Sequence, residues 1–244
     1  MTHTAESWQQ RYRRVFYESK PGWIDGTEEF HRLCAATIGG SGKILEIGAG
    51  PSNPTSRFLA TLGEVHGLDP DPLLRDNDAL ATAAVLEGAH FPFRDASFDA
   101  CVSNYVIEHV ADPAAHLREV ARVLRPGGTY VFRTPNRLHY VALVARATPH
   151  WFHVLVANRL RNELVQAHDP YPTVYRCNSR TAVKRFAQTS GLEVAELRMI
   201  EKEPSYGMAS RALFFPLLAY ERLVNATSSA AGFRANILAV LRKP

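Results

Sequence analysis

The sequence has little cysteine and no long hydrophobic run, and each absence excludes a class of protein. Its 244 residues include three cysteines, which lie far apart without a CxxC spacing: Cys34, Cys101 and Cys177. An odd number of scattered cysteines argues against a disulfide framework and indicates reduced thiols in a cytoplasmic setting. The longest apolar run, 212–220, falls well short of the roughly 18 residues that span a bilayer. Residues 1–18 lack the apolar stretch of a signal peptide, so we expect neither a signal nor a transmembrane segment.

The sequence also lacks a concentration of charge of one sign. Lys and Arg number 28 against 24 Asp and Glu, giving a formal net charge of +4, and 46% of residues are hydrophobic. This composition is typical of a folded globular protein. The densest basic cluster is Arg11, Arg13 and Arg14, which is either a solvated helix face or a surface that attracts an anionic substrate. No basic stripe follows a phosphate backbone, so we do not expect a nucleic-acid substrate.

Strands and helices are expected to alternate from residue 43 to residue 135. The strands are predicted at 43–47, 64–68, 83–86, 98–103 and 129–133, with two more at 193–200 and 235–242. Helices are predicted at 7–18, 27–38, 56–62, 72–82, 112–124, 179–190 and 211–226. Several strands are nearly continuous apolar runs, which is typical of a parallel sheet covered on both faces. The pattern therefore predicts an α/β fold with a doubly wound, mostly parallel, seven-stranded sheet.

We interpret the whole chain, 1–244, as a single domain with four parts. Residues 1–42 form an N-terminal helical cap, 43–136 the core, and 179–244 the C-terminal part of the sheet. Residues 137–178 interrupt the alternation and are rich in histidine and aromatic residues. We expect them to be a helical insertion, or lid, over the carboxyl edge of the sheet, on the substrate side.

A glycine turn follows the first predicted strand in the run Ile47-Gly48-Ala49-Gly50-Pro51. Glycines allow positive φ and close approach of the backbone to a ligand, and the helix beyond is expected to offer unpaired N–H groups. A dinucleotide-binding GxGxxG pattern would need glycine at 53, where Asn53 stands. Asp69 ends the second strand and can accept hydrogen bonds from both hydroxyls of a ribose. The alternative for Asp69 is an ordinary turn residue.

An ordered series of motifs follows between residues 87 and 128. They are Glu87 to Phe93, Ser97-Phe98-Asp99, Glu108-His109-Val110 and Arg122 to Gly128. With the glycine turn and Asp69 in register, residues 43–136 resemble the class I S-adenosyl-L-methionine (SAM)-dependent methyltransferases, in particular the small-molecule, ubiquinone-type group. The resemblance implies a Rossmann-like fold, SAM as cofactor and S-adenosyl-L-homocysteine as product. We expect no metal, because methyl transfer from SAM does not require one and the sequence has no compact metal-ligand spacing.

The resemblance also implies which residues contact the cofactor. Five would shape the methionine and ribose pocket: Glu46, Gly48, Ala49, Gly50 and Pro51. Asp69 would bind the ribose hydroxyls and Pro70 would pack by the adenine. Glu87, Gly88 and Ala89 would border the adenine edge, although the family usually has Asp followed by Ala where Glu87 is followed by Gly88. Asn104 and the backbone of Tyr105 would lie beside the methionine moiety.

Three residues are candidates for catalysis: His109, His139 and Tyr17. A histidine titrating near neutral pH can deprotonate a phenol or activate a hydroxyl group. His150 and His153, in the insertion, are also available. The alternative for each histidine is a capping or packing role. Tyr17 is placed to close over SAM from the N-terminal helix, and its alternative is packing of that helix.

The acceptor is expected to be a small molecule in a biosynthetic reaction, with oxygen favoured over nitrogen and carbon. Residues 103–106 read Ser-Asn-Tyr-Val rather than the Asp/Asn-Pro-Pro-Tyr of amino-methylating nucleic-acid enzymes. Aromatic residues at 151, 152, 214, 215 and 220 indicate either lid packing, a pocket for an aromatic or lipid-like acceptor, or peripheral docking on a membrane. A SAM-fold enzyme that does not transfer methyl, and a binding protein without catalysis, are the rival interpretations. The sequence is compatible with a monomer or a homodimer.

Overall fold

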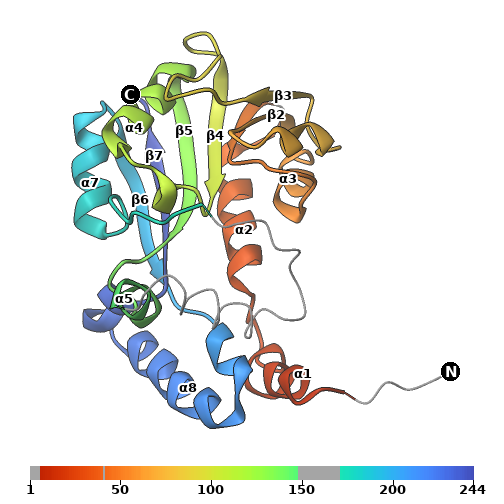
Figure 1. The fold of residues 1–244 in the computed structure, drawn as a ribbon, viewed down its shortest axis with the longest axis vertical. Helices are drawn as coiled ribbons and strands as arrows, with labels where there is room; N and C mark the ends of the chain where they lie inside the picture. The colour runs from red at the N-terminus through yellow and green to blue at the C-terminus, as the bar shows by residue number, and fades with distance from the viewer. Residues whose placement is uncertain (1–5, 41, 148–170) are drawn as a thin grey trace, which may run out of the picture.

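The computed structural model describes residues 6–40, 42–147 and 171–244 and contains a seven-stranded sheet (Figure 1). The strand order is β3-β2-β1-β4-β5-β7-β6. The strands are β1 Gly42–Ile47, β2 Gly63–Asp69, β3 Thr82–Val85, β4 Phe98–Asn104, β5 Leu124–Pro135, β6 Glu193–Ile200 and β7 Asn236–Arg242. The first five strands pair in parallel, whereas β7 runs antiparallel to both of its neighbours. The prediction of a doubly wound, mostly parallel, seven-stranded sheet is confirmed.

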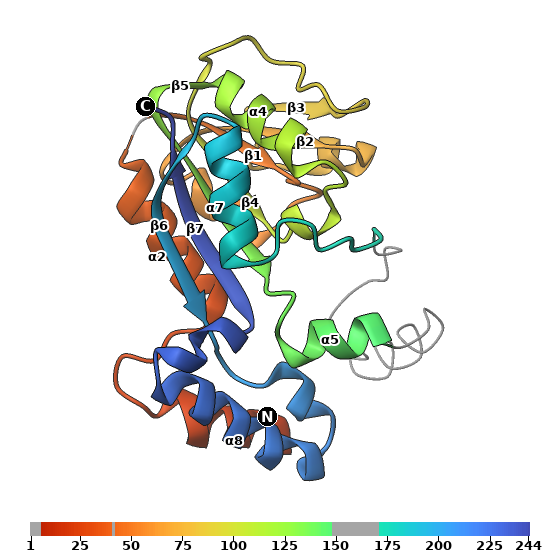
Figure 2. The same cartoon turned by 90° about the vertical axis from the view of Figure 1, so that its left-hand side faces the viewer.

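Helices cover both faces of the sheet (Figures 1 and 2). Helices α2 Gly26–Ile38 and α3 Pro54–Leu59 contribute to one buried core, and α4 Pro113–Val123 and α7 Arg180–Thr189 to the other. Successive strand residues point to opposite faces, so Ile44 joins the core under α2 while Leu45 joins the core under α4. Burial on both faces explains why the strands are nearly continuous apolar runs.

Local sequence signals set where several helices begin. The Asp112 side chain accepts hydrogen bonds from the backbone N–H groups of Ala114 and Ala115, and Pro113 occupies the first turn of α4. The Ser179 side chain caps α7 in the same way. Both are N-cap arrangements that satisfy backbone donors left free at a helix start.

A third group of helices lies beyond the carboxyl ends of the parallel strands (Figures 1 and 2). It comprises α1 Trp8–Arg13, which continues as the π-helix η1 Arg14–Glu18, together with α5 Tyr140–Ala147 and α8 Arg211–Ala226. The ring of Phe214 in α8 lies 4.7 Å from that of Tyr12 and 5.3 Å from that of Phe16. The first and last helices of the chain therefore pack together, and we call this group the helical layer.

The structure corrects the helix expected at 72–82. Only Pro72–Asp76 is helical there, as the short 3-10 helix η2, and β3 begins at Thr82. The Asp71 side chain caps this single turn. Asn77 then leaves helical geometry, with φ −83° and ψ 104°, because its side chain is drawn into hydrogen bonds with the glycine turn.

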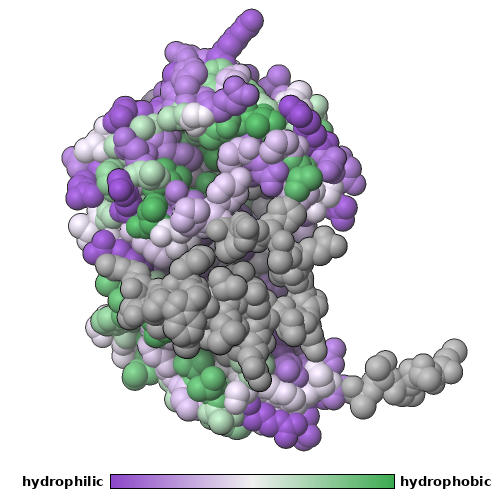
Figure 3. All heavy atoms as spheres, in the orientation of Figure 1, coloured by the Kyte–Doolittle hydropathy of each residue, from purple (hydrophilic) through white to green (hydrophobic). Residues whose placement is uncertain are grey.

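The helical layer carries much of the exposed apolar surface. Exposed apolar side chains on α5 and α8 include Leu143, Val144, Leu213, Phe215 and Leu223. Figure 3 shows hydrophobic surface at this end of the molecule. In the ranges that the structure describes, no helix is long and apolar enough to cross a membrane. Within the predicted insertion, α5 is helical, whereas 148–170, including His150 and His153, lies outside the described residues.

Candidate active site

The parallel strands end at one level on either side of the point where strand order reverses. Strand β1 lies between β2 and β4, and Ile47 at its end is in register with Leu68 of β2 and Ser103 of β4. Crevices at such switch points are the usual ligand sites of open parallel sheets. The turns after β1 to β4 carry the predicted cofactor residues, so the structure brings to one edge Gly48, Ala49, Gly50, Pro51, Asp69, Pro70, Glu87, Gly88, Ala89, Asn104 and Tyr105.

Two glycines of the turn after β1 are required for different reasons. Gly48 has φ +73°, and a Cβ there would lie 2.2 Å from Cγ2 of Val106. Gly50 has φ +52°, but a Cβ there would meet nothing within 4 Å. Gly48 is thus needed for close packing against the turn after β4, whereas Gly50 lies in a positive-φ conformation beside open space.

Two asparagines hold the glycine turn in shape. The Asn53 side chain accepts hydrogen bonds from the first backbone N–H groups of α3 and donates one to the carbonyl of Ala49 at 2.7 Å. The amide of Asn77 donates to the carbonyl of Gly50 at 3.1 Å and to the Ser56 hydroxyl at 2.9 Å. The expectation that this helix start offers unpaired N–H groups is therefore wrong for the two that Asn53 satisfies. The role of Asn77 was missed because it depends on a contact 27 residues away.

Asp69 lies at the end of β2, with 8% of its surface exposed. One carboxylate oxygen accepts a hydrogen bond from the N–H of Gly50 at 3.0 Å and the other from Asp71 at 2.8 Å. Burial raises the pKa of this carboxyl above its usual value, while the two backbone donors oppose that rise. Each oxygen keeps a lone pair, since a carboxylate accepts about four hydrogen bonds.

Glu46 projects from β1 with 4% of its surface exposed. Its Oε2 has no hydrogen-bond partner among the described residues. Burial raises the pKa of this carboxyl to about 7. A buried polar atom without a partner is costly, so this oxygen is suited to receive a donor from a ligand.

Glu87, Gly88 and Ala89 form an exposed turn after β3. The N–H of Leu86 donates to the carbonyl of Asp69 at 2.9 Å, which fixes the start of this turn beside the end of β2. Gly88 has φ +78° with open space around it. The predicted adenine contacts of these three residues stay a prediction.

A chain of polar contacts runs between α2, α3, β4 and β5 close to the switch point. The Thr55 hydroxyl lies 3.2 Å from Nε2 of His31 and accepts from the Asn104 amide at 3.4 Å. The Asn104 carbonyl oxygen accepts from Nε of Arg133 at 2.8 Å, and Nη2 of Arg133 reaches the Thr27 hydroxyl at 3.3 Å. Apart from Asn104, the sequence motifs did not single these residues out, because their meeting depends on the sheet bringing distant segments together.

Tyr105 follows β4 in a strained backbone conformation, with φ +60°. Its N–H donates to the carbonyl of Arg133 at 2.9 Å, and the guanidinium of Arg133 lies 4.4 Å from the centre of the tyrosine ring. Positive φ in a residue other than glycine is costly and gathers at ligand sites.

A second buried polar chain attaches residues 171–178 to the sheet edge. The Thr134 hydroxyl donates to Glu108 at 2.9 Å and accepts from the Asn178 amide at 2.7 Å. The N–H of Val174 donates to the carbonyl of Glu108 at 2.7 Å. Burial raises the pKa of the Glu108 carboxyl to about 7. The C-terminal end of the predicted insertion is therefore held next to the turn after β4.

The structure separates the two histidine candidates. His109 is partly exposed at the end of the short helix η3 Ile107–His109, where its Nδ1 lies 3.3 Å from the carbonyl oxygen of Pro172. His139 is 6% exposed, and its Nε2 lies 3.4 Å from Oε2 of Glu201. His139 also packs against the ring of Tyr220, at 5.6 Å. His109 thus borders the site, whereas His139 is enclosed between the end of β5 and α8.

Tyr17 lies inside the helical layer with 1% of its surface exposed. Its hydroxyl donates to Glu221 of α8 at 3.3 Å, and the guanidinium of Arg222 lies 5.3 Å from its ring. Burial raises the pKa of this phenol. These contacts favour the packing interpretation, and a catalytic role for Tyr17 stays a prediction.

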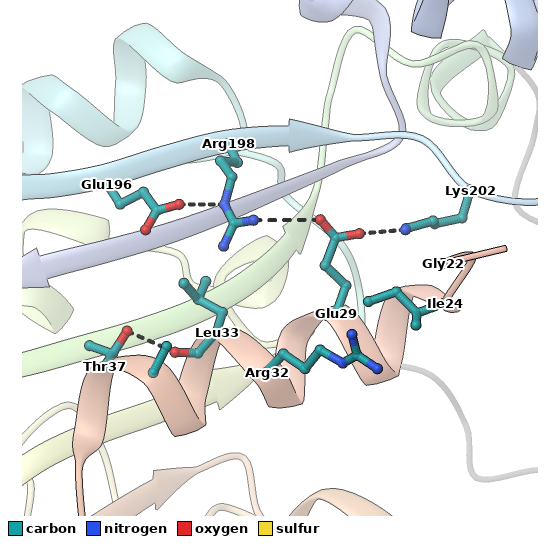
Figure 4. Close-up of a pocket in the computed structure, with 10 residues that line it drawn as sticks. Gly22, Ile24, Glu29, Arg32, Leu33, Thr37, Glu196, Arg198 and Lys202 are labelled. Atoms are coloured by element: carbon teal, nitrogen blue, oxygen red, sulfur yellow. Dashed lines mark hydrogen bonds and ion pairs between the residues drawn. The ribbon is translucent and has the colours of Figure 1, made fainter.

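Two cavities, of about 480 and 440 Å³, lie along α2 and β6 rather than at the glycine turn. Figure 4 shows the first, where Glu29 pairs with Lys202 at 2.5 Å and with Arg198 at 3.7 Å. Arg198 also pairs with Glu196. These charges are already matched with one another, and the half-exposed Arg198–Glu196 pair contributes little stability. We therefore place the site at the strand ends, where unmatched buried polar groups lie. No cluster of three or more His, Cys, Asp or Glu side chains that could hold a metal occurs within the described ranges.

A doubly wound sheet with a glycine turn after β1 and an acid at the end of β2 defines the class of Rossmann-like proteins that bind nucleoside cofactors. Comparison with known proteins narrows this class. Residues 45–132 match the family described as "Methyltransferase domain". A Mycobacterium sp. (strain KMS) "uncharacterized methyltransferase" is 38% identical over 101 residues, which are 39% of each chain. The chain thus spans about two fifths of the length of that relative.

A longer match is to a "ubiquinone biosynthesis O-methyltransferase" of Ralstonia nicotianae, 28% identical over 76% of this chain and 73% of the relative. The fold is similar to that of a solved "putative sarcosine dimethylglycine methyltransferase" from Galdieria sulphuraria, with a TM-score of 0.56 at 16% identity over 89% of this chain and 85% of that one. Residues 45–132 are thus similar to a methyltransferase domain, and the matches together support a class I SAM-dependent methyltransferase.

Proposed function

We propose that the protein transfers a methyl group from SAM to an oxygen atom of a small-molecule acceptor. The observation that carries the cofactor part is the arrangement of Gly50, Asp69 and Glu46 at the switch point. Gly50 leaves open space, Asp69 keeps acceptor capacity for the ribose hydroxyls, and Glu46 offers an oxygen without a protein partner. These features fit a nucleoside that carries an amino-acid group.

SAM, when bound, supplies the electrophilic methyl group on its sulfonium. The chain's own residues must then align the acceptor, exclude water and take up a proton where the acceptor is a hydroxyl. His109 is the residue we propose for the proton. It is partly exposed beside the turn after β4, and the contact of its Nδ1 with Pro172 leaves Nε2 available to accept a proton.

We propose that the helical layer and the 137–178 segment form the acceptor side of the site. The layer lies beyond the strand ends, and its exposed apolar side chains favour an aromatic or lipid-like acceptor over a strongly charged one. The O-methyltransferase match supports oxygen as the acceptor atom, since that relative's name specifies it.

One experiment tests cofactor use and another tests acceptor class. Calorimetry with SAM must show binding, and its absence would remove both the methyltransferase and the non-methylating SAM-enzyme interpretations. Incubation with SAM and a panel of phenols, carboxylic acids and amines is then read for S-adenosylhomocysteine. Turnover with phenols supports the proposal, whereas turnover with amines alone contradicts oxygen as the acceptor atom.

The role of His109 is tested by His109→Gln in the same assay. A proton-accepting His109 predicts that kcat with a phenol falls by roughly 10²- to 10⁴-fold, while the affinity for S-adenosylhomocysteine is unchanged. His116→Gln, which replaces a partly buried histidine on α4, is the control for loss of an imidazole. Unchanged kcat in His109→Gln would leave proton removal to another group.

A further inference from the structure

Arg133 is a buried cation that the fold leaves without an anionic partner. It projects from β5 with 4% of its surface exposed. Among the described residues, no carboxylate oxygen lies within ion-pair distance of its guanidinium, whose Nε and Nη2 contact the neutral oxygens of Asn104 and Thr27. Its remaining terminal nitrogen, Nη1, makes no hydrogen bond to the described part of the chain.

The surroundings of Arg133 stabilise the charge without neutralising it. The guanidinium lies 4.4 Å from the ring centre of Tyr105 and 5.4 Å from that of Phe30. Such cation–π contacts offset part of the cost of burying a charge, but a guanidinium keeps its proton and its demand for an anion. His31, which reaches the same polar chain, has a lowered pKa because it is buried and lies near Arg133. The carboxylates of Asp25 and Glu108 act on Arg133 only at longer range, so an anion entering here would meet a guanidinium that no described carboxylate contacts.

A glycine lies beside the unpaired nitrogen of Arg133. A Cβ on Gly26, the first residue of α2, would lie 3.3 Å from Nη1 of Arg133. That distance is tighter than an ordinary contact, so a larger residue at position 26 would crowd the guanidinium. Glycine at position 26 avoids this contact with Nη1, beside which the Lys202 side chain also passes, with its Cγ 3.6 Å from the same Cβ position.

Arg133 and Glu46 lie on the same face of the sheet, on either side of β4. Glu46 is in register with Val102 of β4, and Val102 with Val131 of β5, so Arg133 lies two residues further along on the face that carries Glu46. Two strand spacings and two residues separate their Cα atoms by roughly 12 Å. One face thus carries a buried carboxylate oxygen and a buried guanidinium, each without a charged partner. An amino-acid zwitterion has the complementary pair of charges.

We propose that Arg133 binds the α-carboxylate of the methionine moiety of SAM, as a partner that the sequence motifs do not assign. The inference rests on the proposed function. A planar guanidinium suits a carboxylate because its N–H groups match the two oxygens. Asn104, which accepts from Nε of Arg133, fixes the guanidinium at the end of β4 beside the turn that holds Gly48.

The test uses calorimetry on the full chain with two ligands that differ in one group. S-adenosylhomocysteine carries the carboxylate, and its decarboxylated analogue, S-adenosyl-3-thiopropylamine, does not. We expect Arg133→Met to lower the affinity for S-adenosylhomocysteine about 30- to 100-fold, as for loss of a charge-assisted hydrogen bond. Its affinity for the analogue should stay within about twofold of the wild-type value. The affinity of Arg133→Lys for S-adenosylhomocysteine should lie between those of the wild type and Arg133→Met. Arg198→Met is the matched control, because it removes the same charge from a half-exposed side chain of β6. It should bind both ligands with wild-type affinity.

Several results would overturn the assignment. Equal weakening of both ligands by Arg133→Met would make Arg133 a support of the pocket rather than a carboxylate partner, and Arg133→Lys decides in the same way if the Met variant does not fold. Unchanged affinity for both ligands, together with a raised KM for an acidic acceptor, would show that Arg133 binds a carboxylate of the acceptor and not that of SAM. Wild-type protein that binds neither ligand would contradict the proposed function itself, which separates that failure from the failure of Arg133 alone.

Discussion

The carboxylate of Asp69 accepts a hydrogen bond from the backbone N–H of Gly50 at 3.0 Å. This contact ties the end of β2 to the glycine turn that follows β1. The other carboxylate oxygen accepts from Asp71 at 2.8 Å, so one side chain orders two turns. The same side chain is the one expected to hold the ribose hydroxyls. The geometry of both turns therefore depends on the same carboxylate that we propose binds the cofactor.

Asp69→Ala is expected to abolish binding of SAM and S-adenosylhomocysteine in calorimetry. The substitution removes both the ribose acceptors and the contact that positions Gly50. Asp69→Asn keeps one acceptor oxygen and is expected to weaken binding by at least tenfold without abolishing it, since a charge-assisted hydrogen bond is replaced by a neutral one. Asp95→Asn, which changes the exposed ion-pair partner of Arg122, is the control for loss of a carboxylate and should keep the wild-type affinity. Unchanged affinity in Asp69→Ala would refute the cofactor site described above.

Gly48→Ala and Gly50→Ala are expected to differ in their effect on folding. A methyl group on Gly48 collides with Val106, whereas one on Gly50 meets open space. Both changes place alanine at positive φ, which costs roughly 1–2 kcal/mol. Urea unfolding should therefore show a larger loss for Gly48→Ala than for Gly50→Ala.

The double variant Gly48→Ala/Val106→Ala separates collision from backbone strain. Removing the valine methyl groups should restore part of the stability that Gly48→Ala loses, so the two changes should be non-additive in a double-mutant cycle. Strict additivity would contradict the close packing of the turns after β1 and β4. The Gly50→Ala/Val106→Ala pair is the matched control and should be additive.

Local signals account for what the sequence predicted of the fold. Apolar runs located all seven strands, and Asp112 and Ser179 marked the starts of two helices, because such signals act within a few residues. The helix expected at 72–82 failed because the Asn77 side chain bonds to Gly50, a tertiary contact that local propensity does not contain. Tertiary hydrogen bonds can override the periodicity of a short segment.

The residues of the candidate site also divide into those that local motifs predict and those that depend on tertiary packing. The glycine turn and Asp69 belong to short motifs and were recognised from the sequence. Arg133 was not, since its burial and its missing anionic partner follow from the packing of α2 against β5. Tyr17, a candidate for catalysis or for packing, makes its hydroxyl contact with Glu221, 204 residues away, which no local signal contains.

The buried carboxyl of Glu108 should make stability depend on pH. Burial raises its pKa to about 7, above the unfolded value near 4.5, so folding favours the protonated form. Its contribution is therefore fully present below about pH 4.5 and is lost as the pH rises through 7. The loss is at most about 3 kcal/mol for this shift.

Glu108→Gln should remove this dependence while keeping an oxygen that can accept from Thr134. Urea unfolding at pH 4.5, 6 and 8 should show a flatter profile for Glu108→Gln than for the wild type, with the difference largest at pH 8. Glu193→Gln, on an exposed carboxyl at the start of β6, should leave the wild-type profile unchanged. Identical profiles for Glu108→Gln and the wild type would show that Glu108 is ionised in the folded protein.

The packing of the first helix on the last can be tested at two adjacent phenylalanines of α8. Phe214 is fully buried against Tyr12 and Phe16, whereas Phe215 is 51% exposed. Phe214→Ala should cost about 3–5 kcal/mol because it leaves a cavity between α1 and α8, which lowers Tm by roughly 6–20 °C in a chain of this size. Phe215→Ala should cost less than about 1 kcal/mol. Calorimetric unfolding of the two variants gives the comparison, and equal effects would contradict the placement of α1 against α8. If the helical layer forms the acceptor side, as we propose, Phe214→Ala should also raise KM for the acceptor more than it weakens the binding of S-adenosylhomocysteine.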